Sequence, residues 1–101
     1  MIRHIVAFQL ASEDPGTRQR HSAEMRSRLE ALVDVDPGLI SLEVHEDLGA
    51  VATHWPLVLV SEFETSEALG RYLVHPRHRA VVDWMNDGIV SDRVVVDYEV
   101  R

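Results

Sequence analysis

Three side chains capable of acid–base chemistry, His4, Tyr72 and His78, occupy positions whose spacing directs them toward a shared interior. His4 alternates in phase with the apolar Val6 and Phe8, so it shares their side of an expected strand. Tyr72 and His78 each share a helical face with apolar residues. An imidazole can take a proton from carbon or oxygen near neutral pH, and a phenol can donate a hydrogen bond to an oxygen that gains negative charge. The pattern therefore predicts a cavity with a histidine base and a tyrosine donor.

Four further side chains are expected to contact a ligand in this cavity, and they are His75, Phe8, Val82 and Met85. A competing interpretation is structural: His4 and His78 are then buried core residues that satisfy one another's hydrogen bonds. The spacing is compatible with both interpretations. The remaining histidines are expected at the surface, and they are His21, His45 and His54.

A metal site is the weakest of the alternatives. His75 and His78 could supply two ligands and His4 a third, but Pro76 interrupts the helical geometry that would align the pair. No carboxylate lies nearby in the sequence, and no glycine-rich nucleotide motif or serine-hydrolase motif is present. We therefore expect neither a metal nor an organic cofactor.

Composition narrows the function further. The chain has 101 residues, 46% of them hydrophobic, which is enough for a single domain over residues 1–101. A net charge of −7 argues against nucleic acid and anionic membranes as partners. There is no cysteine and no lysine, so thiolate nucleophiles and lysine Schiff bases are excluded. No apolar run has the length of a membrane helix or a signal peptide, and a cytoplasmic location is the default expectation.

The elements that must position these side chains follow a β-α-β-β-α-β order. Strands are expected over residues 2–10, 39–47, 55–64 and 94–100. The first helix is expected from a cap at Asp14 to about Val33, a short second helix from a cap at Ser66, and a further helix over about 77–86. In the second strand, Ile40 is expected on the same face as Leu42 and Val44, with which it alternates. This order predicts an α+β, ferredoxin-like fold with a four-stranded antiparallel sheet.

The sheet is expected to be apolar on both faces. Helices in this topology cover one face only, yet apolar residues also fall on the other, and they are Ile5, Ala7, Val58, Val60 and Val95. No element is left over to cover them, so a second copy packed sheet to sheet about a two-fold axis is the economical solution. The alternative is a monomer with a loosely amphipathic sheet.

Several segments carry a resemblance to a known family. They are Arg3-His4-Ile5-Val6, Pro37-Gly38, Leu59-Val60-Ser61-Glu62-Phe63, Tyr72-Leu73-Val74-His75-Pro76-Arg77-His78 and Val96-Asp97-Tyr98. Together they resemble the Dabb family, the stress-responsive dimeric α/β-barrel domains, over essentially the whole chain. The resemblance implies a ferredoxin-like fold and a homodimer built by sheet-on-sheet packing.

The resemblance also implies roles for the site residues. A plant polyketide cyclase of this family performs a cofactor-free intramolecular aldol cyclisation, and similarity to it makes His78 the base, Tyr72 its partner and His4 the supporting histidine. We thus expect a cavity that binds or transforms a small carbonyl compound, as a cofactor-independent lyase or cyclase if the protein is an enzyme. The alternatives are a non-enzymatic stress-responsive or ligand-binding dimer and, by fold analogy alone, a cofactor-free monooxygenase.

Overall fold

One antiparallel sheet holds all four strands in the order β2-β3-β1-β4, which confirms the predicted sheet. The computed structural model describes all 101 residues. In chain order the elements are β1 (Ile2–Leu10), α1 (Pro15–Glu30), β2 (Leu39–Glu46), β3 (Leu57–Phe63), α2 (Ser66–Val74), α3 (Pro76–Asn86) and β4 (Val90–Glu99).

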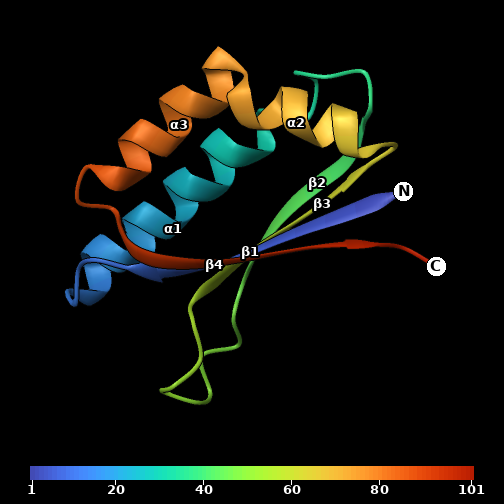
Figure 1. Ribbon diagram of the computed structural model, residues 1–101. Helices are drawn as coiled ribbons and strands as arrows, with labels where there is room; N and C mark the ends of the chain where they lie inside the picture. The colour runs from blue at the N-terminus through green and yellow to red at the C-terminus, as the bar shows by residue number, and fades with distance from the viewer.

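The three helices cover one face of the sheet, and the other face is bare (Figure 1). The apolar core lies between the helices and the covered face. The two ends of the chain lie side by side, because the Val100 N–H donates to the Met1 carbonyl at 2.9 Å. No helix combines the length and the apolar character that a bilayer-spanning segment requires.

The first helix begins as predicted but ends early. The Asp14 carboxylate accepts a hydrogen bond from the Thr17 N–H at 2.9 Å, which caps the helix. After Glu30 the chain tightens into shorter turns, with the Leu32 N–H bonded to the Leu29 carbonyl. This tightening keeps Leu32 buried and leaves Val33 43% exposed, so the predicted extension to Val33 was wrong.

The break between the second and third helices depends on His75. Proline disfavours a helical conformation in the residue before it, and His75 is extended, with φ −62° and ψ 136°. Its Nδ1 atom accepts a hydrogen bond from the Arg77 N–H at 3.1 Å, so His75 caps α3. Thr65, and not the predicted Ser66, caps α2, because its hydroxyl accepts from the Ala68 N–H.

An ion pair between the exposed Arg71 and the buried Asp36 fixes α2 against the turn before β2. The Arg71 guanidinium donates to Asp36 at 2.8 Å, and the Gly38 N–H donates to the same carboxylate at 2.9 Å. The Arg71 guanidinium, with the Gly38 N–H, holds the pKa of Asp36 below its ordinary value. A Cβ atom at Gly38 would lie 2.5 Å from the Ala68 Cβ, so only glycine allows this approach. The contact sets the position of α2 and hence of Tyr72.

Two strands differ from the expected alternation. In β2 the register shifts between Leu39 and Ser41, so that Leu39 and Leu42 face the core while Ile40 is 46% exposed. The prediction that Ile40 shares the buried face was therefore wrong.

The last strand starts at Val90, earlier than predicted. Each of its side chains points to the face of the sheet opposite to the one predicted. Val95 pairs with the buried Val6, and directly paired residues share a face, so the placement of Val95 on the open face was wrong. Apolar residues occupy both faces of this strand, and alternation alone could not fix its orientation. The residues facing the helices are Arg93, Val95 and Asp97, and those on the open face are Val94, Val96 and Tyr98.

Candidate functional site

A cavity of about 290 Å³ lies between the helices and the covered face of the sheet, next to the edge strand β4. Its wall is mostly apolar and includes side chains from β1, α2, α3 and β4. Six residues predicted from the sequence line it, namely His4, Phe8, Tyr72, His78, Val82 and Met85. Two polar residues that sequence reasoning did not select also line it, Arg93 and Asp97.

His4 forms an acid–base pair with Asp97. The two residues are direct partners in the β1–β4 pairing, and the His4 Nδ1 atom lies 2.5 Å from the Asp97 Oδ1 atom. His4 is 5% exposed. Because a carboxylate accepts, Nδ1 is the donor of this bond, and Nε2 is the ring nitrogen that takes no part in it. The signal for Asp97 was an acidic residue directly after the apolar run Val94–Val96, and only the strand register connects it to His4.

His78 has the protonation state that a general base needs. Its Nδ1–H donates to the Leu73 backbone carbonyl at 3.1 Å, which leaves Nε2 unprotonated. Burial lowers the pKa of His78 below its ordinary value of 6.5, against the opposing effect of the Leu73 carbonyl. His78 is therefore neutral at neutral pH and able to accept a proton.

Tyr72 is the most buried polar side chain next to the cavity. It is 1% exposed, and its hydroxyl has no hydrogen-bond partner. Its ring contacts His78, with centroids 4.5 Å apart, and lies 6.5 Å from the ring of His4. Burial raises the pKa of Tyr72, so the phenol stays protonated and keeps a proton to donate. A buried hydroxyl without a partner is rare and requires an explanation.

His75, predicted to contact a ligand, does not line the cavity, because its ring caps α3 instead. His4, His75 and His78 form no group that could hold a metal ion. His45 and His54 pair with Glu43 and Asp47 at the surface. His21 is partly buried, and its Nδ1 atom has no partner.

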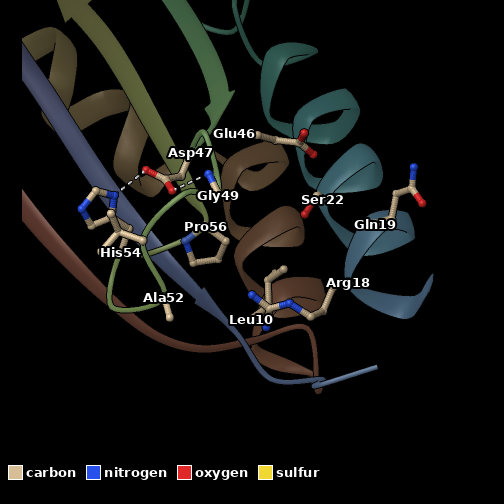
Figure 2. Close-up of a pocket in the computed structure, with 11 residues that line it drawn as sticks. Leu10, Arg18, Gln19, Ser22, Glu46, Asp47, Gly49, Ala52, His54 and Pro56 are labelled. Carbon is tan, nitrogen blue, oxygen red and sulfur yellow. Dashed lines mark hydrogen bonds and ion pairs between the residues drawn. The ribbon is translucent and has the colours of Figure 1, made fainter. Parts of the chain in front are cut away.

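A second, larger hollow of about 370 Å³ lies between α1, the end of β2 and the loop of residues 47–56 (Figure 2). Asp47 accepts from the Gly49 N–H at 2.9 Å and lies 3.1 Å from the His54 Nδ1 atom. The Gly49 N–H lowers the pKa of Asp47. These contacts hold the loop together, and they pair Asp47 with His54, the only histidine that lines this hollow. The smaller cavity is therefore the candidate site.

Comparison with known proteins agrees with this fold. Residues 2–100 match the model of the stress responsive A/B barrel domain, Dabb. A dimeric ferredoxin-like protein of unknown function from Bacteroides fragilis is 26% identical over 98% of this chain and 95% of its own, with a TM-score of 0.85. A Dabb family protein from Mesorhizobium loti is 24% identical over 99% of this chain and 96% of its own, with a TM-score of 0.74.

A hydroxynitrile lyase from Passiflora edulis is 17% identical, covers 99% of this chain and 93% of its own, and has a TM-score of 0.81. At that identity the likeness shows the fold alone. No curated protein matches the chain. The predicted ferredoxin-like fold is confirmed by these structures, two of which are described as ferredoxin-like.

Proposed function

This chain belongs to the stress responsive A/B barrel domain family, and we propose that it is a homodimer. We propose further that its cavity binds a small carbonyl compound and transforms it by acid–base chemistry without a cofactor. The observation that carries the proposal is the Tyr72 hydroxyl, which is buried, protonated and without a partner beside the neutral imidazole of His78. The carbonyl oxygen of a ligand is the partner that this hydroxyl lacks.

The proposed reaction begins with proton abstraction. Nε2 of His78 takes a proton from the carbon next to the carbonyl. The electron pair of the broken C–H bond forms a C=C bond, and the π pair of the carbonyl moves onto its oxygen. Tyr72 donates a hydrogen bond to that oxygen as it becomes negative. The enolate then attacks a second carbonyl, or it is reprotonated. His4, held by Asp97, orients the substrate through its Nε2 atom.

The fold-level comparison gives limited support for a lyase. The Passiflora edulis protein is described as a hydroxynitrile lyase, so one protein with this fold carries lyase activity. The residues of this chain's own cavity provide the specific argument.

The homodimer is argued from the bare face of the sheet. Val94 and Val96 are 49% and 54% exposed there, beside the partly buried Ile5 and Val60. A continuous apolar face of this kind is typical of an interface. The related proteins from Bacteroides fragilis and Thermobifida fusca are described as dimeric. We propose that two copies pack through this face.

Proton abstraction can be tested without knowing the natural substrate. Wild-type protein is incubated in D₂O with a panel of aryl methyl ketones such as acetophenone, and loss of the methyl proton signal is followed by NMR. We expect faster exchange than in buffer, and about 100-fold or greater loss of that acceleration in His78→Gln. His54→Gln, which changes a surface histidine, is the matched control and should keep the wild-type rate. Equal rates in wild type and His78→Gln, or no acceleration by wild type with any ketone, would contradict the proposal.

A further inference from the structure

One cation faces the cavity. Arg93 is the only arginine that lines it, and it lies on the helix-facing side of β4, directly paired with Phe8. Its guanidinium carbon is 5.9 Å from the centroid of the Phe8 ring, so the charge lies over that ring. Arg93 could not be placed in the cavity from the sequence, because β4 was expected to face the other way.

The charge of Arg93 is not neutralised within the chain. The chain carries 17 acidic residues, yet none of them forms an ion pair with Arg93. One Nη atom donates to the side-chain carbonyl of Asn86 at the end of α3, which holds the guanidinium in place. A guanidinium has five N–H donors, so this single bond leaves most of them for another acceptor. An anchored, unpaired guanidinium is suited to a planar anion such as a carboxylate.

The two charged residues of the cavity lie at opposite ends. Arg93 pairs with Phe8, and Asp97 pairs with His4. The two pairs are four positions apart on β1, a distance of about 13 Å along the strand. An anionic group is therefore attracted to the Arg93 end and repelled from the Asp97 end, where His4 lies. His78 lies between the two, within reach of the Arg93 charge, which also lowers its pKa. The wall between the two ends includes Val6 and Val82 and is apolar.

We infer that the cavity binds an elongated carboxylate. Its carboxylate pairs with Arg93, its apolar body lies along the wall, and its reacting carbonyl lies at the His4 and His78 end. This inference rests on the proposed function, since it specifies the substrate of the same cavity. It restricts that substrate to carbonyl compounds that carry a carboxylate at the far end from the reacting carbon.

A pair of probes that differ only in charge tests the inference. 5-Phenylpentanoate and 5-phenylpentanamide have the same length and apolar body, and each is titrated into ¹⁵N-labelled protein while backbone and histidine signals are followed. We expect both to shift the signals of His78 and Phe8, with the acid binding about tenfold tighter or more, as one charge-assisted contact provides. Arg93→Gln should remove the preference for the acid and keep the weaker amide binding. Arg79→Gln makes the same change of charge on the exposed side of α3, and it should keep the preference.

The outcomes separate the two proposals. Equal binding of the acid and the amide by wild type overturns the anion preference and leaves the cavity as a ligand site. An acid preference that survives Arg93→Gln overturns the assignment to Arg93. If neither probe shifts the cavity signals of wild type, both the inference and the proposed ligand site fail. The comparison of the two probes on wild type needs no variant to fold.

Discussion

The imidazole of His4 and the carboxylate of Asp97 are joined at 2.5 Å although 93 positions of sequence separate them. The first and last strands are adjacent in the sheet, so the acid–base pair exists only once the two ends of the chain have paired. The chemistry of the cavity thus depends directly on the sheet topology.

Removing the partner of His4 should destabilise the protein. Asp97→Ala leaves the buried His4 Nδ1–H without an acceptor, and we expect the free energy of unfolding to fall by about 1–3 kcal/mol. Asp97→Asn keeps an oxygen in place and should cost less. Urea denaturation at pH 7 measures both changes. Exposed Asp92 on the same strand provides the control, Asp92→Ala, which should change stability little. Equal losses in all three variants would contradict the role of the pair.

His78 should make the protein less stable in mild acid. Burial lowers its pKa in the folded state, so near pH 6 the unfolded chain binds more protons at this residue than the folded protein does. Its contribution to the free energy of unfolding is therefore complete above the ordinary pKa of about 6.5 and is lost as the pH falls toward the lowered value. We expect the stability of wild type relative to His78→Gln to decrease between about pH 7.5 and 5.5. An NMR titration of the His78 ring should give a pKa below 6.5, and a pKa above it would contradict the prediction.

Tyr72→Phe should separate function from stability. The hydroxyl has no partner in the folded chain, so removing it deletes an unsatisfied buried group, and we expect the free energy of unfolding to stay within about 0.5 kcal/mol of wild type or to rise. Catalysed exchange of ketone protons should nevertheless fall, by about 100-fold if the hydroxyl stabilises the enolate oxygen. A large loss of stability with unchanged exchange would mean that the hydroxyl is structural.

Gly38→Ala should loosen the packing of α2. The added Cβ would meet the Ala68 Cβ at 2.5 Å, a clash that we expect to cost about 1–3 kcal/mol of unfolding free energy. Gly70→Ala is the matched control: nothing lies within 4 Å of a Cβ there, and alanine in a helix should stabilise by about 0.5–1 kcal/mol. The double variant Gly38→Ala/Ala68→Gly should recover part of the loss. Thermal denaturation of the four proteins measures these effects, and no recovery in the double variant would argue against the clash.

A charge on the bare face of the sheet should separate the two copies. Val96→Asp places a carboxylate opposite Ile5 in the proposed interface, and we expect a monomer by light scattering at concentrations where wild type is a dimer. Val33→Asp changes an equally apolar, exposed residue away from the sheet and should leave the dimer intact. A wild-type monomer, or a dimer of Val96→Asp with wild-type affinity, would contradict the sheet-to-sheet arrangement.

Much of the fold could be predicted because its signals are local. Alternating apolar residues predicted β1 over its observed bounds, and the proline after Asp14 predicted the start of α1. The facing of β4 was predicted wrongly because the local signal there was symmetric. Val94, Val95 and Val96 are equally apolar, so only pairing with β1 decides which of them faces the helices.

The same ambiguity limited prediction of the site. Phe8, Tyr72 and His78 could be predicted to converge because each is in phase with apolar residues of its own strand or helix. Asp97 and Arg93 come from the strand with two apolar faces, so their entry into the cavity could not be seen before the register was known. The error at His75 has a different cause, which does not involve strand register. The His75 ring accepts a hydrogen bond from the Arg77 N–H, two residues along the chain, and this contact turns it away from the cavity.

The hydrogen bond between Val100 and Met1 makes this chain nearly circular. A short linker could join its ends, and new ends could be opened in the exposed loop at Gly49–Ala50, far from the candidate site. In such a circular permutant β4 and β1 would become a hairpin, and the contact between Asp97 and His4 would change from one of the most distant in the sequence to a local one. The barrier to closing the longest loop of the fold would then fall, and the permuted chain should fold faster while keeping the same cavity.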